Sequence, residues 1–297
     1  MSTREQEASE LAAADLEWFH SIELVPGIAT PGRAPQSHFD DSLAGMRLPD
    51  LTGKSVLDIG AYDGFFSFAA ERAGAARVVA LDHYVWFTDM KGYMDDWRQS
   101  QIDGTPLVAP HESRHWQPES LPGRRPFDAA HAFLGSTVEP VVGDFMTMDL
   151  EPLGTFDVVL FLGVLYHLES PLEAMRRVRR LVAPGGLAVV ETEAMTIDGL
   201  EEQSLCRFFP GRELNNDPSN WWVPNGRAFT DLGVAAGFDR ATLLSEPPAP
   251  DAPDPVPAVD RARSLLDAGR SMLRTRSLPK PAPPVPRHYR ATAHFHA

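Results

Sequence analysis

The chain has 297 residues, of which 43% are hydrophobic and 23% charged, so it can form one large α/β domain with additions or two small domains. Its net charge of -14 disfavours a surface that grips polyphosphate, and its single cysteine, Cys206, excludes an internal disulfide. Because Cys206 belongs to no pattern with metal-ligand spacing, we expect no metal site.

Residues 1–54 are predicted to form a helical segment that covers a cleft, with a helix over residues 5–20. The opening "MSTREQEASELAAADLEWF" is acidic and lacks the apolar core of a signal peptide. The longest apolar run, "VVLFLGVLY", is far shorter than the ~20 residues that span a bilayer. We therefore expect a cytoplasmic protein without a membrane partner.

Residues 55–246 are predicted to form the core, because apolar strand-like runs alternate there with helical patterns. The predicted strands cover 55–60, 77–82, 138–144, 156–163 and 186–194. The predicted helices cover 65–73, 127–135, 171–182 and a last stretch, capped by Asn225, that runs to Ala236. Apolar strands separated by helices are typical of a sheet covered on both faces, so we predict an α/β fold with a doubly wound, mainly parallel sheet.

Two segments depart from this pattern. Residues 83–126 are too long for an ordinary connection, and their aromatic residues predict a folded insertion with some helix. Residues 247–288 begin with a proline-rich linker, 247–258, and continue into a basic stretch. From Arg261 to Arg290 seven arginines and one lysine face one aspartate, a net of +7. Residues 289–297 alternate like a strand, and we predict that this last strand of a seven-stranded sheet runs antiparallel.

The stretch "VLDIGAYDGFFSF" reads as a buried strand, a glycine-containing turn and an apolar helix. Such a turn aims backbone N–H groups and the positive helix end at a ligand, which suits adenine-containing cofactors. Its pattern is D-x-G-x-x-x-G, from Asp58 through Gly60 to Gly64, and it lacks the glycines that a pyrophosphate requires. This points away from NAD, and the acid can take a cationic amine.

The segments "VLDIGAYDG", "VVALD", "GDF" and "FDVVLFLGVLYHL" follow one another over Ser55 to Ala194 in an order that resembles the class I S-adenosylmethionine-dependent methyltransferases. "GVLYHLESPLEAM", "WWVPNGRAFTDLGVAAGF" and "RATAHF" resemble the subgroup of bacterial tRNA wobble-uridine (5-oxyacetic acid) carboxymethyltransferases. The resemblance implies a Rossmann-like methyltransferase fold that binds S-adenosyl-L-methionine and releases S-adenosyl-L-homocysteine.

The resemblance also implies cofactor contacts at the strand ends. The turn around Gly60 would hold the methionine end, Asp82 both ribose hydroxyls and Asp144 the adenine amino group, while Gly163 would approach the sulfonium. The full predicted set is Asp58, Gly60, Ala61, Tyr62, Gly64, Asp82, His83, Asp144, Phe145, Leu162 and Gly163.

The predicted catalytic residues are His167 and Tyr166, which follow the strand that would end beneath the sulfonium. His167 is either a general base or a locally packed histidine, and Tyr166 either a cleft wall or a core residue. The predicted substrate contacts are Tyr62, Trp86, Trp221, Trp222 and Arg290. The alternative for Tyr62 is packing on the N-terminal segment, and for Trp221 and Trp222 it is core packing.

Three functions remain open from the sequence. We favour methyl transfer to a hydroxyl or amine of a small molecule in secondary metabolism, because the aromatic insertion is large enough to form a lid. The alternative is tRNA wobble-uridine modification. It is favoured by the subgroup resemblance, in which Arg290 and Tyr166 match an arginine and a tyrosine, and by the +7 stretch. It is disfavoured by the charge of -14 and because the first lysine is Lys54, whereas those enzymes hold an extra carboxylate with an N-terminal lysine. The third is cofactor binding without turnover. The oligomeric state is left open.

Overall fold

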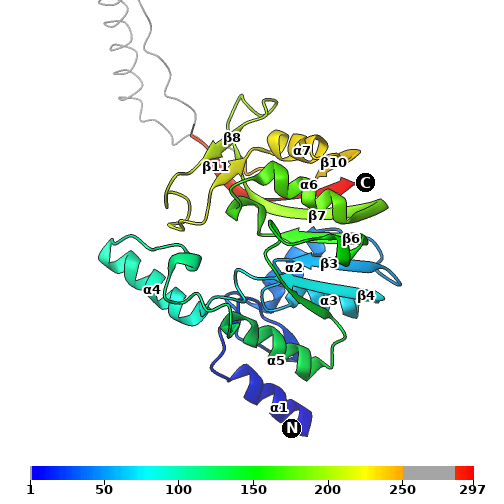
Figure 1. Cartoon of the computed structure of the whole chain (residues 1–297), viewed down its shortest axis with the longest axis vertical. Helices are drawn as coiled ribbons and strands as arrows, with labels where there is room; N and C mark the ends of the chain where they lie inside the picture. Colours follow the sequence, from blue (N-terminus) through cyan, green and yellow to red (C-terminus); the bar gives the residue numbers. More distant parts are fainter. Residues whose placement is uncertain (1, 250–284) are drawn as a thin grey trace, which may run out of the picture.

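The computed structural model describes residues 2–249 and 285–297. Its centre is a seven-stranded sheet with the strand order β10-β11-β7-β6-β3-β4-β5 (Figure 1). The strands of this sheet are β3 (Ser55–Ile59), β4 (Arg77–Asp82), β5 (Glu139–Val142), β6 (Phe156–Leu162), β7 (Val182–Thr196), β10 (Arg240–Leu243) and β11 (Arg287–His296).

Five strands of the sheet, β3 to β7, run parallel to one another. Strand β11 lies antiparallel between β7 and β10. The predicted fold class is therefore confirmed, including the antiparallel last strand. Strand β11 alternates as its sequence indicates, since Ala291, Ala293 and Phe295 are buried and the residues between them are less so.

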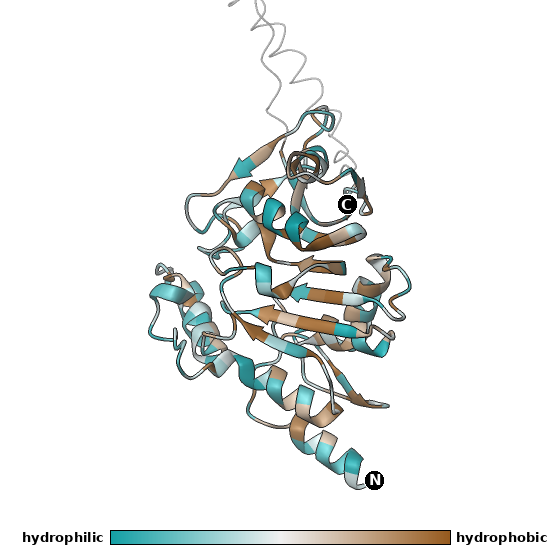
Figure 2. Cartoon of the chain, turned by 45° about the vertical axis from the view of Figure 1, so that its right-hand side comes forward, coloured by the Kyte–Doolittle hydropathy of each residue, from teal (hydrophilic) through white to brown (hydrophobic). Residues whose placement is uncertain are grey.

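Helices cover both faces of the sheet because successive strand residues point to opposite faces. In β3, Leu57 and Ile59 pack with α6 and α7, whereas Val56 packs with α3 and α5. These helices are α3 (Phe65–Arg72), α5 (Arg125–Leu134), α6 (Pro171–Leu181) and α7 (Gly226–Ala235). The strands are brown in Figure 2, whereas the helices carry teal residues on their outer sides. The predicted cap of α7 is present, because the Asn225 side chain accepts the Ala228 N–H at 2.9 Å.

The N-terminal segment contains α1 (Thr3–Ala12), a hairpin of β1 (Glu23–Val25) and β2 (Ile28–Ala29), and α2 (Gln36–Gly45). The predicted helix over 5–20 was too long, since α1 ends at Ala12. The reason lies in the main domain, where the buried Asp63 carboxylate accepts the N–H groups of Phe19 at 2.9 Å and His20 at 2.8 Å. A continued helix would have used these donors internally.

Two further segments surround the carboxyl ends of the parallel strands. Residues 83–126 contain α4 (Met90–Asp103) and the short 3₁₀ helices η1 (Pro110–Glu112) and η2 (Pro122–Arg124). Residues 197–225 contain a hairpin of β8 (Cys206–Phe208) and β9 (Trp222–Pro224). The two segments meet where the Arg212 guanidinium donates to the Thr105 carbonyl.

Most of the proline-rich linker and of the basic stretch lies outside the described residues, so the expectations for 250–284 stay predictions. No helix in the described ranges is long and apolar enough to cross a membrane.

Candidate active site

The ends of four parallel strands meet at one edge of the sheet and bring the predicted cofactor contacts together. The N–H groups of Gly60 and Ala61 donate to the Leu81 carbonyl at 2.8 and 3.2 Å, which joins the turn after β3 to the end of β4. The Gly143 N–H donates to the Asp82 carbonyl at 3.2 Å, which joins β4 to the loop after β5. In a parallel sheet this edge is where ligands bind.

The turn after β3 depends on glycine at two positions. Gly60 has a φ of 83° and Gly64 a φ of 88°, values that favour glycine. A Cβ on Gly60 would lie 2.4 Å from the Val164 side chain, so the loop after β6 closes directly on this turn. Gly64 then caps α3, whose N-terminal N–H groups face the same edge.

Tyr62 packs on the N-terminal segment, as one of its two predicted roles required. Its ring lies 5.1 Å from that of Phe19, centroid to centroid. Its φ of 53° is left-handed, and its carbonyl accepts the indole N–H of Trp86 at 2.7 Å. The hydroxyl of Tyr62 is buried and has no hydrogen-bond partner among the described residues, and burial raises its pKa. The phenol therefore anchors the segment that lies over the turn.

Trp86 does not reach a ligand from where the structure places it. Its side chain is 0% exposed and packs against Phe127, while its N–H holds the Tyr62 carbonyl. The sequence predicted Trp86 as a substrate contact, but the indole fills the core beneath the insertion. We therefore remove Trp86 from the predicted substrate contacts.

Asp82 ends β4 with its carboxylate turned toward the turn after β3. One oxygen accepts the Tyr62 N–H at 2.9 Å and the other the Val85 N–H at 3.2 Å. Each carboxylate oxygen can accept a second hydrogen bond, so the pair can still take a diol. Burial raises the pKa of Asp82, and the two backbone donors partly oppose this.

Asp58 supports the turn from behind. It is 2% exposed and accepts the Ser67 hydroxyl at 2.6 Å, which ties β3 to α3. Burial raises its pKa to about 6, against the opposing effect of Ser67. The sequence indicates that this acid can take a cationic amine, and in the structure one of its two oxygens is bound by Ser67.

Asp144 and His83 face each other across the loops after β4 and β5, with 4.0 Å between the imidazole Nε2 and a carboxylate oxygen. Asp144 accepts the Met146 N–H and the Thr147 hydroxyl, both at 2.8 Å. Phe145 turns its ring into the core, 5.5 Å from that of Phe161. The resemblance implied either an N–H or an apolar face from Phe145 for the adenine, and with the ring in the core the backbone N–H is the group that remains.

A cluster of charged and aromatic side chains lies beyond Leu162 and Gly163, where β6 ends. The Arg290 guanidinium pairs with Glu191 and, at 3.3 Å, with Glu193, and it lies 5.0 Å from the centre of the Tyr166 ring. A Cβ on Gly163 would lie 3.3 Å from that guanidinium. Burial would lower the pKa of Arg290, but Tyr166 and the glutamates raise it.

Glu191 and Glu193 were missed in the sequence. They alternate with Thr192 at the end of β7 and so point to the same face of the sheet as Arg290, which pairs with Glu193 in register. The segment "VVETEA" could have indicated them, because two acids interrupt an apolar strand where it reaches the edge of the sheet at which ligands bind.

His167 is held by a polar chain that the sequence did not indicate. Its Nδ1 lies 2.9 Å from the Ser219 hydroxyl and 3.2 Å from the Ser219 carbonyl. That hydroxyl gives its single proton to Asp217 at 2.6 Å, so both Ser219 oxygens can only accept from Nδ1. Nδ1 therefore carries the imidazole proton, and Nε2 keeps the lone pair of a base. Burial lowers the pKa of His167, so the ring is neutral at pH 7.

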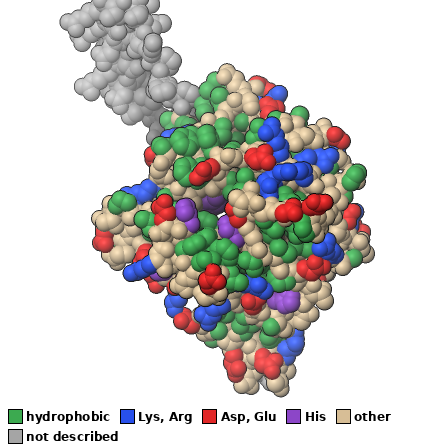
Figure 3. Space-filling model, in the orientation of Figure 1, with side chains coloured by type: hydrophobic (Ala, Val, Ile, Leu, Met, Phe, Trp, Pro, Cys, Tyr) green, Lys and Arg blue, Asp and Glu red, His purple; other side chains and the backbone are tan. Residues whose placement is uncertain are grey.

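Trp221 and Trp222 form part of the wall made by the β8–β9 hairpin. The Trp221 N–H donates to the Tyr166 carbonyl at 2.8 Å, and the Trp222 indole donates to the Glu169 carbonyl at 3.1 Å. Their rings lie 6.2 and 4.7 Å from that of Phe208. Figure 3 shows the face with α4 hollowed at its centre, with histidine side chains around the hollow. The described residues contain no group of three or more His, Cys, Asp or Glu that could hold a metal ion.

The fold is that of a class I methyltransferase, and the protein is an S-adenosylmethionine-dependent methyltransferase. A family model described as a methyltransferase domain matches residues 36–242, and the chain belongs to this family. Its cofactor is S-adenosyl-L-methionine.

Curated relatives carry the name tRNA U34 carboxymethyltransferase. The protein of Chromohalobacter salexigens is 26% identical over 205 residues, which cover 68% of this chain and 49% of the relative. That of Idiomarina loihiensis is 30% identical over 197 residues, covering 66% and 49%. The chain thus spans about half the length of these relatives.

Among solved structures, the N-terminal domain of EvdMO1 in the presence of SAH and D-fucose matches with a TM-score of 0.54 at 18% identity. The match covers 100% of this chain and 97% of that chain. At this identity the likeness concerns the fold.

Proposed function

We propose that this protein transfers a methyl group from S-adenosyl-L-methionine to a hydroxyl or amine of a small molecule. The observation that carries the proposal is the oriented imidazole of His167 beside Tyr166 and the acidic cluster around Arg290, at the edge where the cofactor loops meet. We place this reaction in the cytoplasm and in secondary metabolism, as the sequence first indicated.

The cofactor loops fit the group that the family requires. Asp82 offers two buried oxygens with acceptor capacity for a ribose diol, and Gly60 lets the turn lie directly against Val164 of the loop after β6. Asp144 and the Phe145 N–H would face an adenine, while Leu162 and Gly163 would lie at the methionine end. The rest of the cofactor site would be formed by Ala61, Tyr62, Gly64 and His83. Asp58 would support the turn after β3 from behind.

When bound, the cofactor supplies an electrophilic methyl group on a sulfonium, and its displacement is in line. His167 would take the proton of the acceptor hydroxyl or amine on Nε2, since Nδ1–H is held by Ser219. Asp217 acts through Ser219, because the hydroxyl that it holds becomes an acceptor for the imidazole. Tyr166 would form the wall of the site, with Arg290 against its ring.

The charge of the cluster favours a neutral or cationic acceptor. Two carboxylates, Glu191 and Glu193, face the single guanidinium of Arg290, so the cluster carries a net negative charge. A carboxylate or phosphate brought here would meet repulsion, and Arg290 would have to leave its partners to bind it. Substrate contacts would then come from Trp221 in the hairpin wall and from Arg290 through its glutamates.

The likeness to the EvdMO1 domain supports a small acceptor in one respect. That domain was crystallised in the presence of D-fucose, and 97% of it matches this chain, whereas the match to the tRNA enzyme covers 49% of its length. A neutral sugar hydroxyl fits the charge argument above.

The alternative is a tRNA wobble-uridine modification, and the names of the curated relatives favour it. It requires tRNA to approach an acidic protein of net charge -14. The third possibility, cofactor binding without turnover, would leave the oriented His167 without a role.

A turnover assay tests the proposal. Release of S-adenosylhomocysteine is measured with pooled small metabolites and, separately, with bulk tRNA, using His167→Ala as the matched inactive control. We expect turnover with the metabolite pool alone. Calorimetric binding of S-adenosylhomocysteine without turnover in either pool would instead favour the binding-only protein.

A salt titration addresses the tRNA alternative separately. Anisotropy with labelled bulk tRNA is measured at two salt concentrations, for the wild type and for a variant with Arg270, Arg274 and Arg276 changed to Ala. We expect weak binding at physiological salt. Submicromolar binding that the triple variant abolishes would make tRNA the favoured substrate. The log of the affinity would then fall with log salt by ~0.7 to 0.9 per phosphate contact.

A further inference from the structure

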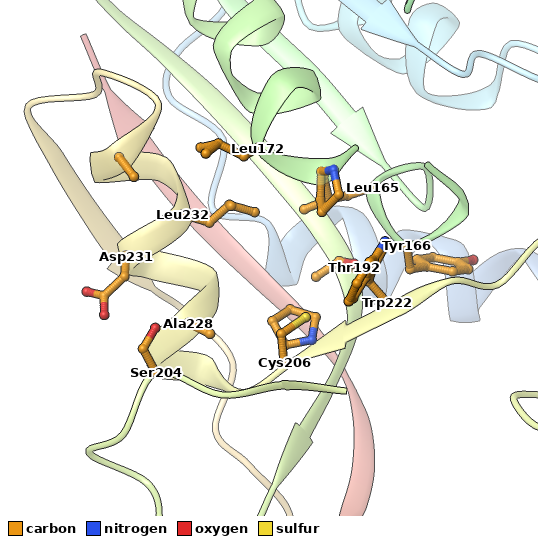
Figure 4. Close-up of a pocket in the computed structure, with 13 residues that line it drawn as sticks. Leu165, Tyr166, Leu172, Thr192, Ser204, Cys206, Trp222, Ala228, Asp231 and Leu232 are labelled. Carbon is orange, nitrogen blue, oxygen red and sulfur yellow. The ribbon is translucent and has the colours of Figure 1, made fainter. Parts of the chain in front are cut away.

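A cavity of about 380 Å³ lies behind Tyr166, on the side of β7 away from Arg290. It is enclosed by η4 (Leu165–His167), α6, α7 and the β8–β9 hairpin (Figure 4). Thr192 points into it, whereas its neighbours Glu191 and Glu193 point to the other face because side chains alternate along a strand. The cavity is thus separate from the cofactor loops and shares only the Tyr166 wall with the cluster described above.

The walls of the cavity are mainly apolar. Leu165, Leu172 and Leu232 lie on one side and the ring of Trp222 on another, as the sticks in Figure 4 show. The volume lies in the range of roughly 300 to 1,000 Å³ that small-molecule sites occupy. An apolar cavity of about 150 Å³ already binds benzene, so one or two rings fit here.

Thr192 supplies one polar group without a partner. Its side chain is 0% exposed, and its hydroxyl makes no hydrogen bond within the part of the chain that the structure describes. A buried hydroxyl without a partner is costly, and the remedy is a ligand or water atom that bonds to it.

The other polar groups in the wall carry no free charge. Asp231 at the rim pairs with Arg227 at 2.9 Å. Cys206 is an exposed free cysteine, and its thiol is neutral at pH 7. Nothing in these walls therefore attracts an ionised ligand.

We propose that this cavity is a second binding site for a neutral, ring-sized apolar molecule that carries one hydroxyl or carbonyl, which bonds to Thr192. Because the site lies on the other face of β7, its ligand binds together with the cofactor. The proposal goes beyond the proposed function and does not depend on it.

Two bromine-labelled probes test the site on the full chain saturated with S-adenosylhomocysteine. Calorimetry compares 4-bromophenol with bromobenzene, and anomalous scattering from bromine locates each probe in crystals. We expect both probes in the cavity, with 4-bromophenol bound more tightly. Thr192→Val keeps the shape and removes the hydroxyl, so it should weaken 4-bromophenol about three- to tenfold and leave bromobenzene unchanged.

A matched pair of substitutions on α7 controls for folding. Ala228→Phe fills the cavity and should abolish binding of both probes, while Val234→Phe, on the same helix at a position 53% exposed, should not. Retained binding of S-adenosylhomocysteine shows that each variant is folded. Bromine density elsewhere, probe binding that survives Ala228→Phe, or equal loss of both probes in Thr192→Val would each overturn the proposal.

Discussion

The two sides of the candidate site are built by different means. The cofactor side consists of strand ends and one tight turn, and hydrogen bonds such as Tyr62 N–H to Asp82 fix its parts to the sheet. The acceptor side consists of connections, namely residues 83–126 and 197–225, joined to the core by side chains such as His167 to Ser219. Regular backbone positions the first side, whereas the second depends on individual side-chain contacts. Substitutions on the acceptor side should therefore lower kcat, whereas substitutions on the cofactor side should lower the affinity for the cofactor.

The largest effect is expected on the acceptor side, at His167. A general base contributes about 10²- to 10⁴-fold, so His167→Ala should lower kcat by that factor. Binding of S-adenosylhomocysteine in calorimetry should stay nearly unchanged, because the imidazole is not part of the cofactor loops. If the variant turns over at the wild-type rate from pH 6 to 9, His167 has a structural role and is not the base.

Asp217→Asn distinguishes a positioned base from a merely packed one. The Asp217 carboxylate raises the pKa of His167 against the larger effect of burial, so its removal lowers that pKa further. The base is active when neutral, and the acid limb of kcat/KM should therefore move to lower pH. An unchanged limb in the pH profile would show that the Asp217–Ser219 pair only supports the loop.

On the cofactor side, Asp82 should give the next largest effect. Asp82→Ala removes the acceptors for two hydroxyls and should weaken binding of S-adenosylhomocysteine roughly ten- to a hundredfold. Because Asp82 also holds the Tyr62 and Val85 N–H groups, loss of affinity alone would not identify the diol contact.

The 2′,3′-dideoxy analogue of S-adenosylhomocysteine makes that identification. Wild-type protein should bind it at least tenfold more weakly than the parent compound, whereas Asp82→Ala should bind both alike. If the variant still prefers the diol, Asp82 supports the loop and another group recognises the ribose.

The difference between the two sides also explains what could be predicted from the sequence. Asp58, Asp82 and Gly163 lie at strand ends because apolar runs end there, and such runs are read directly from the chain. The same reading could not show that Ser67 binds Asp58, since this contact depends on the position of α3.

Contacts between segments far apart in the chain could not be predicted from the sequence. Asp63 binds the backbone of Phe19 and His20, 44 and 43 residues away, and this contact shortened the first helix. Ser219 reaches His167 from 52 residues away, out of a polar turn with no periodic pattern. Trp86 showed the opposite error, because an aromatic residue in an insertion was assigned to a ligand when it fills the core.

Gly60→Ala measures how tightly the turn after β3 is fixed. The added Cβ meets Val164 at 2.4 Å on a backbone with positive φ, so we expect a loss of roughly 2 kcal/mol in the free energy of unfolding. Gly27→Ala is the matched control, with a φ of 84° and no atom within 4 Å. It carries the backbone strain alone. Adding Val164→Ala to Gly60→Ala should remove the difference between the two glycine variants in denaturant titrations. Without such rescue, the close approach to Val164 is not the reason for the glycine.

The smallest effect concerns Asp58 and appears only as pH changes. Its pKa is about 6 in the folded protein and near 3.8 when exposed, so the folded state binds the proton more tightly. The stability that this provides is present below pH ~4 and is lost as pH rises through 6. Asp58→Asn keeps an acceptor for Ser67 and cannot ionise. Relative to wild type it should gain about 1 to 2 kcal/mol in unfolding free energy between pH 4 and pH 7, less than the ~3 kcal/mol that the shift allows. Denaturant titrations at the two pH values measure this gain. A variant that instead loses stability at pH 7 would mean that the ionised carboxylate, and not its burial, holds β3 to α3.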